Sequence, residues 1–295
     1  MTATFTIGCD PEVMLEKNGI LKSAIGLIKG TKEKPTPVSK GAIQHDNVNA
    51  EFNVDPAKSK KEFSENIKAV LADLVKAVAP YRIKVQASAD FPASELKHPK
   101  ARQFGCDPDF DAWSVSMVTV PPGATAAAFR SAGGHLHVGA LNDKQTFLLD
   151  PYGKLDTVRI LDVVVGIPSL LMDKDPTSKA RRGLYGKAGC HRPTSYGVEY
   201  RALGNYWISS PKYVEAVYNL TDCAVKILSD GSFKELLKKV SADKVQDTIN
   251  NSKTADAVTL FNDVIKKYID VKTYDCVTKL SGLTNIPDIY KEWKL

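Results

Sequence analysis

Hydrophobic and polar residues alternate along the first part of the chain. Between positions 4 and 16 apolar side chains occupy the odd positions, while Asp10 and Glu12 share the even ones. Because successive side chains of a β-strand point to opposite faces, the pattern predicts a strand with one buried face and one face carrying two carboxylates. Asn18-Gly19 follows and predicts a hairpin turn.

Three later segments repeat this two-faced pattern. Residues 45–54 predict a strand with His45, Glu51 and several asparagines opposite Val48, Ala50, Phe52 and Val54. Residues 133–139 place His135 and His137 on one face, and residues 196–203 do the same for Glu199 and Arg201. One His-x-His by itself is more typical of a buried strand end than of a ligand pair. Four predicted strands with the same pattern instead favour a ligand site that the polar faces share.

Helical spacing dominates elsewhere. Ser59 and Glu62 have capping-box spacing before an apolar stripe that ends at Pro80, which predicts a helix packed on the sheet. A largely apolar helix is expected from Asp156, its predicted cap, through Leu170, with a kink or break at Pro168. Beyond Pro211 the spacing predicts a helical bundle. The expected division is therefore a sheet domain, 1–211, and a helical C-terminal region, 212–295, packed on it, in the α+β class.

Composition bounds the class of protein. The chain has 295 residues, of which 43% are hydrophobic and 25% charged, with a formal charge of +6. A core of ordinary size and a soluble globular protein follow. The basic excess suits a polyanionic ligand such as a nucleotide, but no dense Lys/Arg block marks a nucleic-acid surface.

Cysteine usage and the N-terminus indicate the compartment. The five cysteines are scattered and contain no C-x-x-C pair, which argues against a disulfide framework or a zinc site. No signal-peptide pattern opens the chain, and no segment is long and apolar enough to cross a membrane. We expect a cytoplasmic protein.

An acidic segment leaves two alternatives open. Asp107, Asp109 and Asp111 have the spacing that begins a calcium loop, but Ala112 and Val118 stand where an EF-hand needs glycine and glutamate. The segment is therefore either a turn that uses Asp and Pro for local geometry or an acidic wall for a cationic substrate group.

If the four strands belong to one antiparallel sheet, their polar faces converge, because the apolar faces must turn toward the covering helices. Several carboxylates close together repel one another unless cations compensate them. Oxygen-rich ligation with an occasional imidazole favours magnesium or manganese over zinc.

Arginines supply a second half of the predicted site. Arg181, Arg182, Arg192 and Arg201 lie in or near a glycine-rich stretch, and planar guanidinium groups suit phosphate oxygens. For any one of them surface ion pairing is about equally expected. As a group facing metal-binding carboxylates they indicate phosphoryl transfer on a polyphosphate. P-loop and Rossmann signatures are missing, so a nucleotide would bind on the sheet.

An ordered set of motifs resembles the glutamine synthetase-like carboxylate-amine ligases, most closely the type 2 amidoligase family of bacteriophages. The set comprises Gly8-Cys9-Asp10-Pro11-Glu12, Asp46-Asn47 through Glu51-Phe52-Asn53, Gly105-Cys106-Asp107-Pro108-Asp109, Gly133 to Gly139, and Arg181 to Arg201. The resemblance covers roughly the first two-thirds of the chain. It implies a curved antiparallel catalytic sheet with packed helices.

The resemblance also implies roles for single residues. Metal ligands would be Asp10, Glu12, Glu51, His135 and Glu199, holding Mg²⁺ or Mn²⁺. His137, Arg181, Arg182, Arg192 and Arg201 would bind ATP phosphates or the substrate carboxylate, with Arg201 steadying the transferred phosphoryl group. Asp107 or Asp109 would receive the amine and help to deprotonate it.

The predicted function is therefore ATP-dependent joining of a carboxylate to an amine through an acyl phosphate, on small-molecule or peptide substrates. Two rivals remain: a guanidino-kinase-like phosphotransferase, and a non-catalytic phage binding or structural protein that retains the fold. If the protein is phage-encoded, the compartment is the host cytoplasm. The substrates and the oligomeric state stay open at this point.

Overall fold

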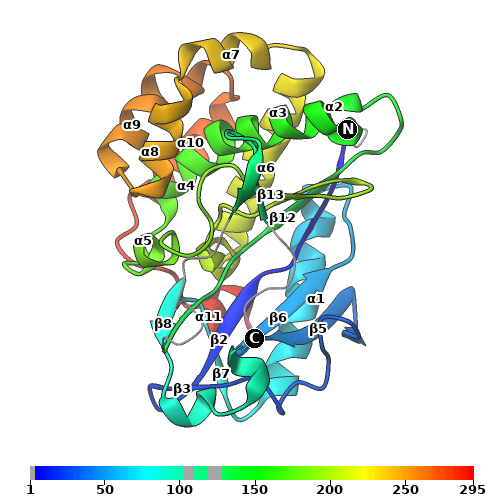
Figure 1. Cartoon of the computed structure of the whole chain (residues 1–295), viewed down its shortest axis with the longest axis vertical. Coiled ribbons are helices and arrows are strands. Elements are labelled where there is room, and N and C mark those ends of the chain that lie inside the picture. Colours follow the sequence, from blue (N-terminus) through cyan, green and yellow to red (C-terminus); the bar gives the residue numbers. More distant parts are fainter. Residues whose placement is uncertain (1–3, 103–108, 119–127) are drawn as a thin grey trace.

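Two antiparallel sheets form the centre of the molecule in the computed structural model, which describes residues 4–102, 109–118 and 128–295. The first sheet has the strand order β1-β12-β14-β13-β9-β10. Its strands are β1 (Thr6–Cys9), β12 (Leu136–Gly139), β14 (Gly197–Tyr200), β13 (Cys190–Pro193), β9 (Asp109–Asp111) and β10 (Ser116–Val118). Segments far apart in sequence are thereby placed side by side (Figure 1).

The register of this sheet aligns the polar positions in rows. His137 lies opposite Gly8 on one side and Glu199 on the other, and Glu199 lies opposite Arg192. Directly opposite residues of antiparallel strands share a face. The predicted parity of the histidine segment and of the Glu199 segment is therefore confirmed, with strands shorter than the sequence patterns.

The second sheet continues from the first through Asp10 and Pro11. Its order is β3-β2-β6-β5-β4, and β7 pairs with β2 on a side path. The strands are β2 (Glu12–Lys17), β3 (Ile20–Lys22), β4 (Thr36–Val38), β5 (Gly41–Asp46), β6 (Asn49–Val54) and β7 (Arg82–Lys84). The 18–19 hairpin is confirmed, since Lys17 pairs with Ile20 and both turn residues have positive φ.

The segment 45–54 is not one strand, as predicted: it contains the end of β5, a tight turn and the whole of β6. Asn47 adopts φ 52° between β5 and β6, and His45 pairs with Ala50. His45 consequently shares the face of Ala50 and lies opposite in parity to Glu51, so the predicted grouping of His45 with Glu51 is wrong. An asparagine in the left-handed region makes this turn possible without glycine.

A small two-stranded sheet lies beside the second sheet. It pairs β8 (Ser88–Asp90) with β11 (Phe129–Ser131), and the short 3-10 turns η1 (Ala93–Leu96) and η2 (Pro99–Arg102) follow β8. Buried Arg130 donates to the Ala101 carbonyl oxygen at 2.7 Å, which fixes η2 on this unit.

Helix α1 (Lys60–Val78) covers the apolar face of the second sheet, as its stripe predicts. Ser59 caps its N-terminus by accepting from Glu62 N at 3.2 Å, and Glu62 accepts from Lys58 N in return. Phe63, Ile67 and Leu71 are fully buried against the core that includes the β-strand residues.

A second group of helices follows β12 along the chain. They are α2 (Thr146–Leu149), α3 (Pro151–Leu161), the π-helical turn η4 (Asp162–Gly166), α4 (Ile167–Met172) and α5 (Ser178–Arg181). Of these, α2 and α3 pack on the first sheet, whereas α5 contacts β8. Asp150, not Asp156 as predicted, caps α3, and Asp156 instead pairs with Arg159. The π-helical turn joins α3 to α4 without a loop, and Pro168 lies in the first turn of α4, so a kink or break at Pro168 stays a prediction.

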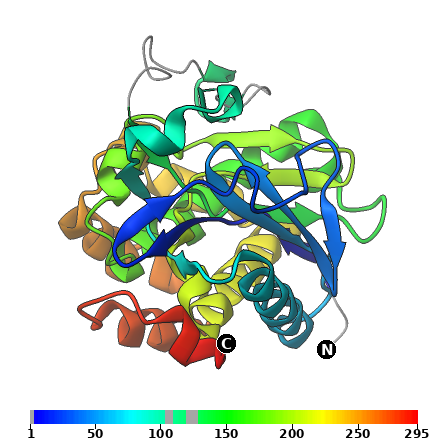
Figure 2. The ribbon, with the colours of Figure 1, turned by 90° about the horizontal axis from the view of Figure 1, so that it is seen from below.

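The C-terminal part is helical, as predicted. After the 3-10 turn η5 (Asn205–Ser209) it contains α6 (Pro211–Ser229), α7 (Phe233–Lys239), α8 (Ala242–Asn250), α9 (Thr254–Asp263), η6 (Ile265–Lys267), α10 (Val271–Ser281) and α11 (Ile289–Trp293). One hydrophobic core includes residues from Phe5 to Trp293, and in the ribbon seen from below α1 and the red C-terminal segment lie under the blue strands (Figure 2). The division at residue 211 stays a prediction. No helix in the described ranges combines the length and apolarity that a membrane span requires.

Glycine at position 197 is required by the contact between β12 and β14. A Cβ added there would collide with the Val138 carbonyl oxygen, which belongs to the neighbouring backbone and cannot rotate away. We expect Gly197→Ala to lower the free energy of unfolding by about 2 kcal/mol. Denaturant titration measures this loss, and Gly282→Ala, whose added Cβ meets its nearest neighbour at an ordinary 3.5 Å, is the control. Equal stability of the two variants would contradict the packing argument.

Candidate active site

The junction of β1 and β2 brings Asp10 against both histidines. Asp10 Oδ1 lies 3.3 Å from His135 Nδ1 and 3.1 Å from His137 Nε2. The register explains this, because Gly8 pairs with His137 and Cys9 with Leu136, so that Asp10 comes opposite His135. The sequence prediction that these three side chains meet is confirmed.

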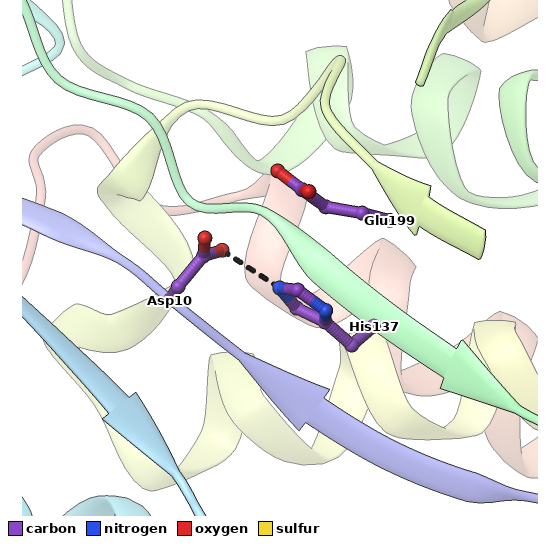
Figure 3. A group of neighbouring side chains, drawn as sticks. All are labelled: Asp10, His137 and Glu199. Atoms are coloured by element: carbon purple, nitrogen blue, oxygen red, sulfur yellow. Dashed lines mark ion pairs between the residues drawn. The ribbon is translucent and has the colours of Figure 1, made fainter. Parts of the chain in front are cut away.

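Glu199 completes this end of the site from the next strand. Its Oε1 lies 3.7 Å from His135 Nδ1. Ligand atoms of Asp10, His137 and Glu199 all lie within 4.8 Å of one another, a spacing that could hold a metal ion. Figure 3 shows the three side chains converging from β12, β14 and the segment that follows β1. His135 borders this group, with its Nδ1 between Asp10 and Glu199.

The two imidazoles have opposite charge tendencies. Burial and the adjacent Arg201 guanidinium lower the pKa of His135, so this ring is neutral. Burial opposes protonation of His137 as well, but the Asp10 carboxylate outweighs it and raises the pKa of His137. Burial would raise the pKa of Asp10, yet the two rings hold that pKa well below its usual range. Asp10 is therefore a carboxylate, and it favours the protonated form of His137.

A second acidic group lies on the second sheet. Glu12 and Glu51 are directly opposite each other across β2 and β6, and so share one face. Burial and the nearby Asp46 raise the pKa of Glu12 to about 7, even though Glu12 accepts from Gly133 N at 3.0 Å. Burial, Asp10, Asp46 and Glu12 together raise the pKa of Glu51. The Asp10 effect on Glu51 links this group to the histidine end of the site.

Arginines face the acids from the other side of Glu199. Arg201 contacts Glu199 through Nη1 and Asp109 through Nε, the latter at 2.9 Å, and its Nη1 lies 3.1 Å from His135 Nδ1. Arg192 approaches Asp109 at 3.3 Å and Glu199 at 3.6 Å. The cross-strand rows dictate this network, because all four residues share one face of β14, β13 and β9.

The structure separates the adjacent arginines Arg181 and Arg182. Arg181 is buried and donates to the carbonyl oxygens of Arg201 and Ala202 at 3.3 and 3.4 Å, and burial with Arg182 lowers its pKa to about 10. Arg182 instead donates to Ser252 Oγ at 2.7 Å, in the turn before α9. Of this pair the structure brings only Arg181 to the other predicted residues. The sequence could not separate them, because in a predicted glycine-rich stretch no periodic pattern fixes the direction of either side chain.

The acidic segment 107–111 is partly described. Asp107 lies outside the described residues. Asp109 is the acid that pairs with the two arginines, while Asp111 accepts from Trp113 N at 2.8 Å and from Ser114 Oγ. Asp111 therefore serves the local turn, which was one of the two alternatives for this segment.

The site also contains Tyr185 and Tyr196. No role was predicted for either tyrosine from the sequence. Tyr196 Oη lies 2.5 Å from His137 Nδ1, on the ring nitrogen turned away from Asp10. The Tyr185 hydroxyl is buried without a hydrogen bond to the described part of the chain, and burial with the charges of Asp109 and Glu12 raises its pKa to about 12. Both directly precede a glycine near the predicted arginines, which was the available signal.

The chain is similar to a known protein family over much of its length. The family model "Phage phiEco32-like COOH.NH2 ligase-type 2" matches residues 114–292, which is more than half of the chain. The match includes the histidines, Glu199 and the arginines, whereas Asp10, Glu12 and Glu51 precede it. No curated protein matches.

Among solved structures, the chain is similar to a bifunctional glutathione synthetase from Pasteurella multocida. The TM-score is 0.46 at 12% sequence identity, over 98% of this chain and 48% of that one. This chain thus spans about half the length of that protein.

The crowded acids predict an unusual pH dependence of stability. Glu12 has a folded pKa of about 7 against an ordinary value of 4.5, so its ionisation between these values destabilises the folded state. Without divalent cations, we expect the wild type to lose about 3 kcal/mol of unfolding free energy relative to Glu12→Gln as the pH rises from about 4 to about 8. Denaturant titrations across this range measure the difference. The control is Glu16→Gln, which removes another acid of β2, one that pairs with Lys84 of β7, and it should show no such effect. Parallel curves for wild type and Glu12→Gln would refute the argument.

Proposed function

The chain belongs to the family of phage phiEco32-like carboxylate-amine ligases of type 2, and from this premise we propose that it joins a carboxylate to an amine at the expense of ATP through an acyl phosphate. We also propose that its curved antiparallel sheets are of the glutamine synthetase-like catalytic type. The observation that carries the proposal is the juxtaposition of buried acids with the Arg192–Arg201 network around Glu199.

The residues fit divalent metals. Two carboxylates and one imidazole, from Asp10, Glu199 and His137, form a set of hard and borderline donors with suitable spacing. Glu12 and Glu51 are a second pair of buried acids whose raised pKa values reflect missing positive charge. Mg²⁺ or Mn²⁺ held by these residues would supply charge neutralisation for the phosphates of ATP.

We propose revised roles for the two imidazoles. Tyr196 Oη can accept the Nδ1 proton of His137, which leaves Nε2 directed at Asp10 as a ligand atom. We therefore propose His137 as the direct ligand. His135, whose Nδ1 lies near Arg201, Asp10 and Glu199, would orient them or add a ligand at the border of the site.

Arg201, Arg192 and Arg181 would stabilise the transferring phosphoryl group. A substrate carboxylate oxygen bonds to the γ-phosphorus while the bond to the β,γ-bridging oxygen breaks, releasing ADP. The amine then attacks the acyl carbon, the bond to phosphate breaks, and phosphate leaves. Guanidinium groups placed where negative charge develops each contribute roughly 3 to 4 kcal/mol to such a step.

The remaining roles follow from position. Asp109 would hold Arg192 and Arg201 in place, since its carboxylate contacts both. Receipt of the amine and removal of its proton are proposed for Asp107 or Asp109. Arg182, turned toward Ser252, is proposed as a structural residue and no longer as a phosphate contact.

The proposed substrates are a small-molecule or peptide carboxylate and an amine. Cys9, Cys190, Cys223 and Cys276 are free thiols, which supports our proposal of a reducing, cytoplasmic setting.

Product analysis tests the reaction class. The protein is incubated with Mg²⁺, ATP and a host extract, and products are followed by ³¹P NMR and mass spectrometry. A ligase releases ADP and free phosphate together with a condensed product one water lighter than its two parts. Transfer of phosphate to a nitrogen acceptor would instead establish the phosphotransferase. No calorimetric binding of ATP in the presence of Mg²⁺ would favour the non-catalytic alternative.

Glu199 is the sharpest single test of the site, because it touches the imidazole and the arginine sides. We expect Glu199→Gln to lower Mg²⁺-dependent ATP turnover at least 100-fold, since it removes a charged ligand and an arginine partner. Turnover is measured at several Mg²⁺ concentrations, with Glu215→Gln, which removes an exposed acid paired with Lys60, as the control. Full turnover of Glu199→Gln would exclude the proposed ligand set.

A further inference from the structure

One buried carboxylate outside the site just described stands behind the arginine side of the first sheet. Asp162 is fully buried and begins the π-helical turn η4, within a run from Ile160 to Met172 whose only other polar side chain is Ser169. Burying a charge there is costly unless the carboxylate is fully hydrogen-bonded. π-helical turns are rare and occur frequently at functional sites.

Asp162 accepts three hydrogen bonds from three separate segments. Its Oδ2 accepts from Trp113 Nε1 at 2.7 Å and from Gly189 N at 2.6 Å. Its Oδ1 accepts from Tyr200 Oη at 2.7 Å. Trp113 follows β9, Gly189 directly precedes β13, and Tyr200 is the last residue of β14.

These three strands are the ones that carry the arginine network on their opposite face. Asp109 lies on β9, Arg192 on β13, and Glu199 on β14, with Arg201 directly after it. Side chains alternate between faces, so Tyr200 reaches Asp162 because Glu199 and Arg201 point the other way. Among the described residues, Asp162 is therefore connected to the site through the backbone of the strands that it joins.

Neighbouring residues leave space for these contacts or hold their donors in place. A Cβ on Gly166 would lie 2.6 Å from Tyr200 Oη, so glycine at this position leaves room for the hydroxyl. The guanidinium carbon Cζ of Arg159 lies 5.9 Å from the centroid of the Trp113 ring. Arg159 Nε also donates to the Ala112 carbonyl oxygen at 3.0 Å. The turn after β9 is thereby held at both the ring and the backbone.

We propose that Asp162 is a positioning residue for the phosphate-binding arginines: by joining β9, β13 and β14 from behind, it sets the relative placement of Asp109, Arg192, Glu199 and Arg201. The inference rests on the proposed function for what those arginines bind. A misplacement of about 1 Å at such groups can cost roughly 100-fold in rate. Asp162 touches no reacting atom.

Three variants test this role by calorimetric titration with ATP in the presence of Mg²⁺. Asp162→Ala removes all three bonds, and we expect roughly 10-fold weaker binding or more. Asp162→Asn retains one acceptor oxygen and an amide that can donate to Tyr200 Oη, so it should recover most of the affinity. Tyr200→Phe removes one bond of the three and should fall between them.

Tyr213→Phe is the matched control. It also removes one hydroxyl hydrogen bond from a buried tyrosine, to the Met172 carbonyl oxygen at 3.2 Å, but Tyr213 lies on α6 away from the three strands. We expect it to lose stability without loss of ATP affinity. If Tyr200→Phe and Tyr213→Phe bind ATP equally well, the positioning role is overturned, even where Asp162→Ala does not fold.

Hydrogen exchange separates failure of this inference from failure of the proposed function. Backbone amides of residues 189–201 in the ligand-free protein should exchange faster in Tyr200→Phe than in Tyr213→Phe, while Asp162→Asn should stay close to the wild type. If wild-type protein binds no ATP while this difference is present, the proposed function fails and the three-strand connection stands. Equal exchange in Tyr200→Phe and Tyr213→Phe overturns the connection itself.

Discussion

Mutual repulsion of buried carboxylates is the constraint on which the arrangement depends. Asp10, Glu12 and Glu51 lie where two sheets meet, and Glu12 and Glu51 are directly opposite each other. Like charges placed this way destabilise a sheet. The protein offsets the repulsion unevenly: the first sheet supplies imidazoles and arginines, whereas the second leaves its acids with raised pKa values. Cation binding is the chemistry for which such an imbalance is suited.

The face of the sheet on which each strand residue lies could be predicted from the alternation in the sequence. The meeting of His135, His137, Glu199 and Arg201 follows from that alternation. The reason is physical: a strand with one buried face has only one acceptable register, and a slip of one residue would expose every apolar side chain. The apolar stripe of α1 was predictable for a similar reason, because a helix needs one face for the core.

Three features could not be predicted, each because a contact distant in sequence decides it. The turn at Asn47 interrupts a run that looks like continuous strand, and only pairing of β5 with β6 fixes it there. Arg182 turns toward Ser252, a residue of the helical region. Asp162 needs donors from three segments. Its lone charge in an apolar run was visible, but its partners were not.

The alternation along β14 also separates two kinds of mutational phenotype within four consecutive residues. Val198 and Tyr200 are fully buried against the helices, so substitutions there should reduce the amount of folded protein in a cell. Glu199 and Arg201 face the site, so many substitutions there should leave protein abundance largely intact while abolishing activity. If abundance and activity are measured for every substitution, the two phenotypes should therefore alternate from one residue to the next along this strand.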